Sequence, residues 1–299
     1  MNLVVGSTGI LGSEICRQLA DKGIPIRALV RATSDRAKVD RLEGIGAEIV
    51  QGDLKDRSSL DAACRGVKAV VSTVSSIPRS YDPKENNLQN VDIEGLANLI
   101  GSAKGAGVEH FIYTSITQDV DCPLRNAKRA GEERLKKSGL TYTILRSNFF
   151  MESWLSPHPM IGFDYANAKA RIYGMGAEPI SWISFKDVAQ FVVESMDNPA
   201  ARNATLALGG PEALSPLQVV KIFEEVGGQR FDVEHVPEEA LKAQQKSATG
   251  ALEQSFTGLT LWYAGGDAID MVPMLKSFPL QLTSVSEYAK SVLAASSAP

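Results

Sequence analysis

The chain has 299 residues, of which 44% are hydrophobic and 22% are charged, and its formal net charge is −4. This composition is typical of a globular protein and excludes a disordered chain, and the length allows one large domain or two modest ones. The small net charge gives no reason to expect nucleic acid or an anionic membrane as a partner, and no apolar run reaches the roughly 18 residues of a membrane span.

The three cysteines, Cys16, Cys64 and Cys122, are far apart in the sequence, and the three histidines are equally scattered. Neither set matches a metal-ligand spacing, so no metal site is expected. An odd and sparse cysteine count is typical of the cytoplasm or another reducing compartment. Because Met1 stands one residue before the first expected strand, a signal peptide is not expected, and the sequence leaves open an organelle leader trimmed from the natural protein.

The first half of the chain alternates short apolar runs with longer amphipathic segments, which predicts strands alternating with helices. The predicted strands span residues 2–5, 25–30, 48–51, 69–74, 110–114 and 141–145. The predicted helices span residues 10–22, 33–43, 58–64, 90–105 and 126–138. Because parallel strands need crossover connections, this order predicts an α/β fold, a Rossmann-type doubly wound parallel sheet with helices on both faces.

The alternation ends near residue 150, where Pro157, Pro159 and several aromatic residues indicate a loop-rich region. Beyond it we expect two short strands, at residues 180–183 and 205–208, and the residues at 172–176 read as loop and turn. Helices are expected at residues 185–197, from 215 onward, and over most of 237–253 and 284–294. We therefore predict a Rossmann domain at 1–150 and a smaller, mostly helical subdomain at 151–299, with segments near 180–210 returning to the sheet.

A glycine-spaced turn joins the first strand to the first helix. Gly6, Gly9 and Gly12 follow the pattern Gly-x-x-Gly-x-x-Gly directly after the apolar run that ends at Val5. In a dinucleotide-binding turn the first glycine allows the tight turn, the second lets the backbone approach a pyrophosphate, and the third lets the helix pack on the strand. The helix N-terminus then binds the phosphates. The residues predicted to contact the cofactor here are Gly6, Ser7, Thr8, Gly9, Ile10, Leu11 and Gly12.

The ends of the next strands indicate which dinucleotide is bound. The second strand ends in Val30-Arg31, where an NAD site normally carries an acid for the ribose 2′-hydroxyl. Arg31 is suited to a 2′-phosphate and favours NADP(H), unless it is a solvated arginine at a strand end. Asp53, after the third strand, is placed either to accept from the adenine amino group or to cap the following turn. Further predicted contacts at strand ends are Leu54, Thr73, Val74 and Thr114.

Taken together, these residues resemble the NmrA-like, atypical branch of the extended short-chain dehydrogenase/reductase superfamily, which includes isoflavone reductase-like enzymes, NAD(P)H-quinone reductases and redox-sensing regulators. The resemblance covers roughly residues 2–210. The segments that carry it are the glycine turn, Val30-Arg31, Gly52-Asp53-Leu54, Asn90-Val91, the run 110–115, the run 140–146 and Asp187-Val188-Ala189.

The resemblance also implies site residues, with one departure. Most of the superfamily uses a Tyr-x-x-x-Lys pair whose tyrosine is the general acid, and here Leu124 stands in the tyrosine's place, four residues before Lys128. In the NmrA-like branch a lysine or histidine precedes a glutamate by four residues, as Lys128 precedes Glu132. Lys128 would then bind the nicotinamide ribose and pass a proton; the alternative is a solvated basic helix face. Ser115 is a second catalytic candidate, or a structural hydrogen-bonding group.

Residues after the sixth strand complete the predicted site. Asn148 and Phe149 are expected to meet the nicotinamide carboxamide, with Phe149 also suited to an apolar substrate pocket or to the core. Tyr165 and Lys169 spell a second Tyr-x-x-x-Lys, but they lie too late in the chain to be the superfamily's pair. The sequence predicts an NADPH-dependent reductase of a small quinone- or enone-type substrate, with a non-catalytic NADP(H)-sensing regulator as the alternative and a scaffold factor as a third, less favoured one.

Overall fold

The computed structural model describes residues 1–77, 80–158 and 161–296, so Pro159 of the predicted loop-rich region lies outside the described residues. Two compact units divide the chain. The first unit comprises Met1–Ile116, Pro123–Arg146 and Val188–Leu206; the second comprises Thr117–Cys122, Ser147–Asp187 and the chain from Ala207 on. The predicted domain boundary at residue 150 remains a prediction.

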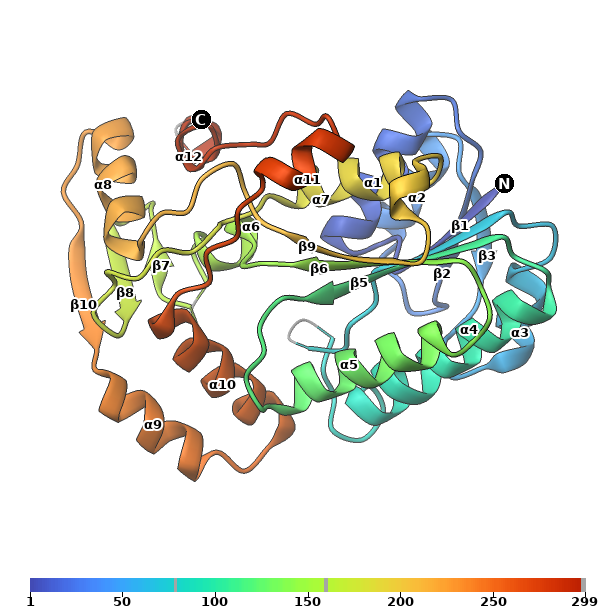
Figure 1. The fold of residues 1–299 in the computed structure, drawn as a ribbon, viewed down its shortest axis with the longest axis horizontal. Coiled ribbons are helices and arrows are strands. Elements are labelled where there is room, and N and C mark those ends of the chain that lie inside the picture. The colour runs from blue at the N-terminus through green and yellow to red at the C-terminus, as the bar shows by residue number, and fades with distance from the viewer. Residues whose placement is uncertain (78–79, 159–160, 297–299) are drawn as a thin grey trace. The chain divides into compact units, whose positions relative to one another are not determined.

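A seven-stranded sheet in the order β3-β2-β1-β4-β5-β6-β9 confirms the predicted doubly wound α/β class (Figure 1). Its strands are β1 (Asn2–Val5), β2 (Ile26–Val30), β3 (Glu48–Gln51), β4 (Ala69–Ser72), β5 (His110–Ile116), β6 (Tyr142–Ser147) and β9 (Ala204–Leu208). The five strands from β3 to β5 in this order pair in parallel. The order reverses between β1 and β4, which is the topological switch point where α/β proteins bind ligands.

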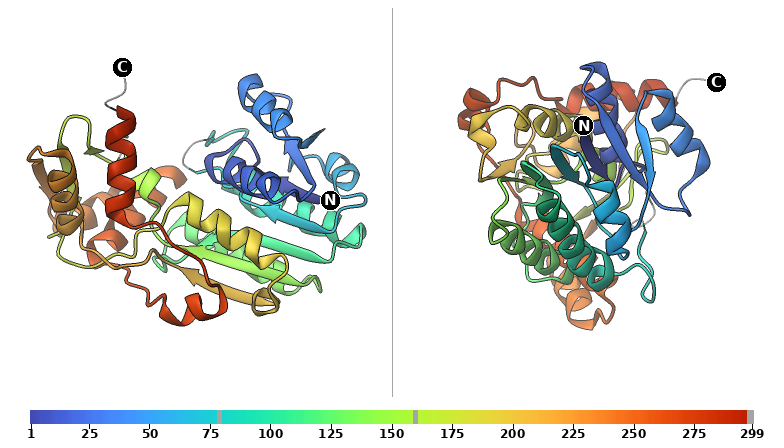
Figure 2. Two further views of the ribbon diagram at one scale, coloured as in Figure 1. Left: turned by 90° about the horizontal axis from the view of Figure 1, so that it is seen from above. Right: turned by 90° about the vertical axis from the view of Figure 1, so that its right-hand side faces the viewer.

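Helices cover both faces of this sheet, with α1 on one face and α4 and α5 on the other (Figures 1 and 2). The helices that connect its strands are α1 (Ile10–Asp21), α2 (Arg36–Gly44), α3 (Arg57–Ala63), α4 (Leu96–Gly105), α5 (Pro123–Lys136), α7 (Phe185–Ser195) and the short 3-10 helix η2 (Pro199–Ala201). Apolar strand residues such as Val70 and Phe111 form one buried core with Leu96 and Leu99 of α4. This core holds the strand ends at fixed positions.

The predicted helix at residues 90–105 has two parts. A π-helix, η1 (Leu88–Gly95), precedes α4. It begins at Asn87, whose side chain accepts a hydrogen bond from the amide of Asn90 at 2.9 Å. π-Helical segments are rare and occur often at functional sites.

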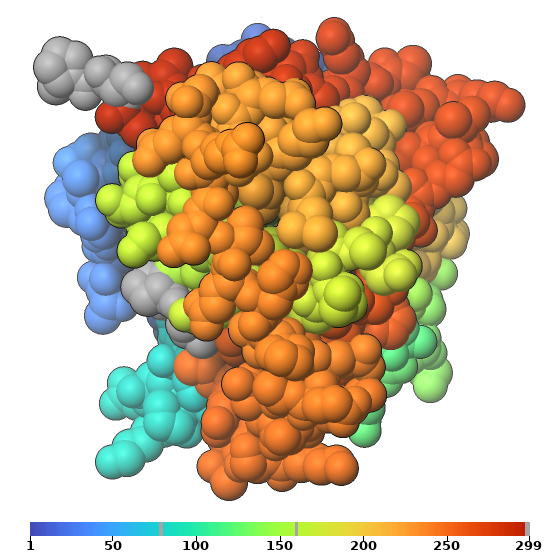
Figure 3. Space-filling view, turned by 90° about the vertical axis from the view of Figure 1, so that its left-hand side faces the viewer, coloured from blue at the N-terminus to red at the C-terminus, as the bar shows by residue number. Residues whose placement is uncertain are grey.

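The second unit has its own small sheet, in the order β10-β8-β7. Its strands are β7 (Phe163–Asp164), β8 (Lys169–Tyr173) and β10 (Asp232–Val236), and its helices are α6 (Met151–Trp154), α8 (Pro216–Gly227), α9 (Glu238–Ser247), α10 (Ala251–Gly265), α11 (Val272–Ser277) and α12 (Val285–Ser296). Side chains of residues 215–250, orange in Figure 3, cover much of one face of this unit. No helix in the described ranges is long and apolar enough to cross a membrane.

Two local predictions in the second unit are wrong. Ile172 and Tyr173, expected in a loop, belong to β8, which pairs in parallel with β10 from about 60 positions later in the chain. The expected strand at 180–183 is not a strand, because Ile180 bridges to Leu214 and Asp267 while Ile183 bridges to Phe150. Single bridges to different partners do not make a continuous ladder.

Candidate functional site

The glycine turn between β1 and α1 has the geometry of a dinucleotide cradle. Gly6 has φ +87°, and a Cβ there would lie 2.6 Å from the Thr73 hydroxyl oxygen. A Cβ on Gly12 would lie 2.1 Å from the Gly6 carbonyl oxygen, so only glycine fits at this helix–turn contact. A Cβ on Gly9 would meet only the Gly6 carbonyl oxygen, at 3.2 Å. Gly6 and Gly12 are therefore required by the fold, and Gly9 is the glycine that leaves room for a ligand.

Other residues predicted at this turn have mixed roles. Ser7 is fully buried, and its hydroxyl donates to the Leu29 carbonyl at 2.8 Å, which ties the turn to β2. Leu11 is buried, whereas Ile10 is 43% exposed and Thr8 is half-buried. The Ser7 and Leu11 side chains thus support the turn, and any contact they make with phosphate would use backbone amides. Gly9 gives no side-chain cap to α1, so its first amides remain available to an anion.

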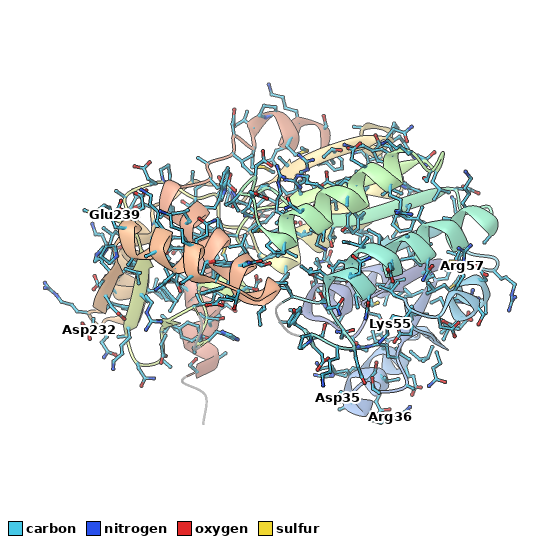
Figure 4. All side chains as sticks on the ribbon, turned by 90° about the horizontal axis from the view of Figure 1, so that it is seen from below. Asp35, Arg36, Lys55, Arg57, Asp232 and Glu239 are labelled. Atoms are coloured by element: carbon cyan, nitrogen blue, oxygen red, sulfur yellow. The ribbon has the colours of Figure 1, made fainter. Side chains whose placement is uncertain are left out.

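Arg31 lies directly after β2 with an exposed side chain. Its amide donates to the Ser34 hydroxyl oxygen at 3.0 Å, which shapes the turn that leads to α2. Arg36, labelled with Asp35 at the start of α2 in Figure 4, is paired with Asp40 at 2.6 Å and Glu43 at 2.9 Å. Within the described ranges the Arg31 guanidinium has no such partner, so it is the arginine at this strand end that is available to a phosphate.

Asp53 and Leu54 follow β3. The Asp53 carboxylate accepts from the Lys55 amide at 2.9 Å, so the turn-capping role considered for Asp53 is present. The capping uses Oδ1, while Oδ2 lies 3.9 Å from the Lys55 ammonium, which Figure 4 labels. Leu54 is buried in the core, and a Cβ on Gly95 would lie 2.8 Å from the Leu54 Cβ. The predicted cofactor contacts of both residues stay predictions.

The strand ends of β4 and β5 hold Lys128, which is 4% exposed. Its ammonium donates to the carbonyls of Val74 at 2.9 Å and Thr114 at 3.4 Å, and it lies 5.1 Å from the centre of the Tyr113 ring. Burial lowers the pKa of Lys128, and the negative charges of Asp92 and Glu132 oppose that shift. The solvated basic face considered for Lys128 is therefore wrong for this residue.

Thr73 and Thr114 form hydrogen bonds to backbone carbonyls of the neighbouring strands. The Thr73 amide donates to the Val5 carbonyl at 3.0 Å, and its hydroxyl lies against the same oxygen at 3.3 Å. The Thr114 hydroxyl donates to the Ser72 carbonyl at 3.3 Å. These bonds join β4 to β1 and β5 to β4, so both threonines align the strand ends beside the glycine turn.

Asp92 on η1 belongs to the same cluster, and the sequence reasoning missed it. Its Oδ1 lies 3.9 Å from the Lys128 ammonium, and the Asp92 side chain is fully buried. Helical periodicity could have predicted that Asp92 is buried. At helical spacing Asp92 lies on the same face as Leu88, Val91 and Leu96, all of which are buried. A carboxylate on an apolar stripe is buried for a specific partner.

Ser115 has a structural partner in the same unit. Its hydroxyl donates to Glu132 Oε1 at 2.6 Å, and Glu132 also accepts from Arg129 at 2.8 Å and from the Arg146 guanidinium. Burial acts to raise the pKa of Glu132, but hydrogen bonds from Arg146 and Ser115 and the arginine charges outweigh it and lower that pKa. A serine hydroxyl has one proton, and here that proton faces Glu132. The geometry favours the structural alternative for Ser115 over the catalytic one.

The two positions where a catalytic tyrosine was sought differ in structure. Leu124 lies in the first turns of α5, four residues before Lys128, and is buried. Tyr165 lies in the turn between β7 and β8, with its ring 6.0 Å from the Phe223 ring, and Lys169 begins β8. A hairpin does not give the one-turn helical spacing of the superfamily pair, so Tyr165 and Lys169 are not that pair.

Asn148 and Phe149 lie in the second unit. The Asn148 side-chain nitrogen, Nδ2, donates to the Asp267 carbonyl at 2.6 Å, and its side-chain oxygen accepts from the Phe149 backbone amide at 2.7 Å. Phe149 is 2% exposed inside an aromatic cluster, with its ring 4.7 Å from that of Trp154 and 5.8 Å from that of Tyr263. Both side chains thus have structural partners, and their contact with a cofactor stays a prediction.

Comparisons with known proteins show which family and fold the chain is similar to. The model of the NmrA-like family matches residues 2–289. An NAD(P)H azoreductase from Xenophilus azovorans is 30% identical, over 99% of both chains. A photosystem II assembly factor, Ycf39 from Trieres chinensis, is 29% identical over 79% of this chain and 72% of its own. The NADPH complex of the quinone oxidoreductase QOR2 from Escherichia coli superposes on this chain with a TM-score of 0.76. The two chains are 21% identical, and the match covers 98% of this chain and 99% of the other. This similarity establishes that they share a fold.

Proposed function

The chain belongs to the NmrA-like family, and we propose that it is an NADPH-dependent reductase whose hydride acceptor is a small conjugated or aromatic molecule of the quinone or enone type. The observation that carries the proposal is the cradle between β1 and α1, where Gly6 and Gly12 fix the turn and Gly9 leaves room beside the helix N-terminus. The reductase and oxidoreductase names of the relatives support a redox role. The acceptor class rests on the resemblance described for the sequence.

The residues present fit NADP(H). The amides at the start of α1, which no side chain caps, would bind the pyrophosphate, and the exposed Arg31 guanidinium would bind the 2′-phosphate. Lys128, held at the ends of β4 and β5, would hydrogen-bond the nicotinamide ribose, as the family resemblance implies. When bound, NADPH supplies the hydride, while the protein supplies orientation and electrostatics.

The proton chemistry of this site differs from that of most of the superfamily. Leu124 cannot donate a proton, whereas the Lys128 ammonium, one turn further along α5, can. Burial lowers the pKa of Lys128 and so makes proton release easier, while Asp92 and Glu132 hold the proton on the amine. The arrangement suits reductions whose product takes its proton from Lys128 or from water, as reduced quinones and enolates do, better than the reduction of a plain ketone.

A second candidate function is a non-catalytic NADP(H)-sensing protein. Two observations favour it: the apolar Leu124 in the position of the catalytic tyrosine, and the assembly factors among the relatives. Such a protein needs the glycine cradle and Arg31 but no acceptor pocket and no proton donor.

The test measures NADPH binding by fluorescence and NADPH oxidation against a panel of quinones, azo compounds and enones. The reductase proposal expects turnover of at least one acceptor, and expects Lys128→Met to reduce kcat/KM by about 100-fold, within the range of acid–base contributions. Lys136→Met is the matched control, because Lys136 lies on the same helix with a partly exposed side chain paired to Glu133. Tight NADPH binding without turnover of any acceptor would instead identify the sensor.

A further inference from the structure

Asp92 is a buried carboxylate whose two oxygens face different groups. Its Oδ2 accepts hydrogen bonds from the Ser76 amide at 3.0 Å and from the Ser76 hydroxyl at 2.6 Å. Its Oδ1 has no hydrogen-bond partner among the described residues and lies 3.9 Å from the Lys128 ammonium nitrogen. One oxygen thus holds the segment after β4, and the other faces the lysine.

The bonds to Ser76 do not require a negative charge. A neutral asparagine carbonyl could accept both of them, and burying a carboxylate is costly unless a counter-charge lies nearby. Asp92 is 2% exposed and Lys128 is 4% exposed. The charge on Asp92 is therefore explained by the ammonium, because nothing else in its described contacts needs it.

The ammonium is in turn held from several elements. The carbonyls of Val74 and Thr114 accept two of its three protons, and the Tyr113 ring of β5 lies beside it. Two charged groups influence it, Asp92 from η1 and Glu132 from α5 itself. Asp92 differs from Glu132, because the Glu132 carboxylate is already shared between Arg129 and Arg146. Asp92 is the carboxylate that faces Lys128.

We propose that Asp92 is a positioning residue, whose charge holds the Lys128 ammonium at the carboxyl ends of β4 and β5 and whose bonds to Ser76 fix the segment that supplies the Val74 carbonyl. Asp92 acts through Lys128 and touches neither cofactor nor acceptor in this role. The inference rests on the proposed function only in giving Lys128 a cofactor to bind.

Asp92→Asn tests the proposal, because it keeps an acceptor for Ser76 and removes the charge. The protein is labelled with carbon-13 at the lysine ε-carbons, the Lys128 signal is assigned with Lys128→Met, and the signal is titrated by NMR without cofactor or acceptor. Lys128 is expected to titrate at lower pH in Asp92→Asn, because burial then acts with less opposition. NADPH affinity should fall roughly tenfold. An unchanged Lys128 titration overturns the proposal.

Asp187→Asn is the matched control. Asp187 is also fully buried and also accepts from the amide and hydroxyl of a single residue, Thr283, at 2.8 and 2.9 Å. Asp187 is not among the charges that shift the pKa of Lys128, so Asp187→Asn should leave the Lys128 titration unchanged. An equal shift in both variants would mean a general loss of structure and would overturn the specific role of Asp92.

A stability cycle covers the case in which Asp92→Asn does not fold. Lys128→Met leaves the buried Asp92 carboxylate without its counter-charge. If the two charges stabilise each other, Asp92→Asn/Lys128→Met should therefore unfold at a higher denaturant concentration than Lys128→Met alone. No recovery in the double variant contradicts the proposal. The NMR readout needs no turnover, so a shifted Lys128 titration in a protein that reduces no acceptor would refute the proposed reduction and leave the positioning role intact.

Discussion

The glycine cradle and the Lys128 cluster lie in the same unit, but they are built in different ways. The cradle is a backbone turn of a few consecutive residues, with the Thr73 hydroxyl packed against it, and its closest approaches are those that a Cβ on Gly6 would make to Thr73 and a Cβ on Gly12 would make to Gly6. The cluster is made of side chains on η1, β5 and α5, and Asp92 and Lys128 are more than 30 residues apart in the chain. A side chain added to the cradle should therefore destabilise the turn, whereas in the cluster the loss of a charged group should have the larger effect.

The largest expected effect is that of Glu132→Gln. Glu132 is 1% exposed and accepts from Ser115, Arg129 and Arg146, so Glu132→Gln removes the negative charge that two partly buried guanidinium groups share. We expect a loss of about 3–5 kcal/mol in the free energy of unfolding, measured by urea denaturation. Ser115→Ala, which removes the hydroxyl that donates to Glu132 and weakly accepts from Arg129 but removes no charge, should cost about 1 kcal/mol. Equal effects of the two variants would contradict the charge-based account.

The same carboxylate predicts a pH dependence. The folded-state pKa of Glu132 is lowered relative to the unfolded chain, so the stability it contributes is present above the unfolded value and is lost as pH falls through the folded one. Glu132→Gln should therefore be less sensitive to acid than the wild-type protein. A variant as acid-sensitive as the wild-type protein would show that Glu132 does not contribute to this loss.

His110, at the start of β5, gives a second acid-sensitive group away from the cluster. Its Nε2 lies 2.8 Å from the Thr143 hydroxyl, which itself donates to the Ala201 carbonyl, so Nε2 is the donor of this hydrogen bond. Burial, with a smaller effect from Arg202, lowers the pKa of His110 from 6.5 to about 4. Between these values the unfolded chain binds the proton first, so stability falls by about 3 kcal/mol as pH drops from about 6.5 to about 4.

The matched variant for this prediction is His110→Gln, which keeps a nitrogen donor for Thr143 and cannot titrate. Urea midpoints measured at several pH values in this range should decline less steeply for the variant. Parallel declines in the two proteins would assign the acid sensitivity to other groups.

Two alanine variants test the cradle itself. Gly12→Ala places a Cβ 2.1 Å from the Gly6 carbonyl oxygen, so the backbone must shift, and we expect a loss of about 2–3 kcal/mol in stability. In Gly9→Ala the nearest atom is 3.2 Å away, and the stability should change by less than about 1 kcal/mol. Both should bind NADPH at least about tenfold more weakly, measured by fluorescence titration. A stable Gly9→Ala that binds normally would show that Gly9 is not the ligand-facing glycine.

The contrast between cradle and cluster also explains how much the sequence predicted. The glycine turn, β1 and the α/β order follow from local patterns, since each is encoded within a few consecutive residues. β8 and β10 could not be predicted in this way, because they pair across about 60 residues and β10 is mostly exposed, without the alternation that indicates a strand. The π-helical segment at 88–95 has no sequence signature of its own, so the sequence predicts an ordinary helix from residue 90 onward.

For the candidate site, the sequence indicated Lys128 and the strand ends but neither the burial of Lys128 nor its carboxylate neighbour Asp92. The burial of Lys128 was available from helical periodicity, because Lys128 and Glu132 lie on the stripe of α5 that also carries Leu124, Ala127, Gly131 and Leu135. The other basic residues of α5 instead favoured the interpretation of Lys128 as part of a solvated helix face. Val74 and Thr114, whose carbonyls accept from Lys128, are among the contacts predicted at the strand ends. Asp92 and Ser76 join them only through the topology of the sheet, which no local pattern encodes. Motif-based prediction therefore identified groups at the strand ends and missed the carboxylate that lies between them.

Arg31→Ala gives the smallest expected effect on the fold and the clearest one on cofactor choice. Arg31 is exposed and makes no ion pair in the described part of the chain, so its removal should change stability by less than about 0.5 kcal/mol. If it binds the 2′-phosphate, the variant should lose NADPH affinity by about tenfold or more and keep its NADH affinity, because only NADPH carries that group. Equal losses for both nucleotides would refute the assignment.

Arg36→Ala is the control, because Arg36 is already paired with Asp40 and Glu43, and it should leave the ratio of the NADPH and NADH affinities unchanged. A change in this ratio caused by Arg31 alone would show that a single exposed side chain at the end of β2 sets cofactor preference without contributing to the fold.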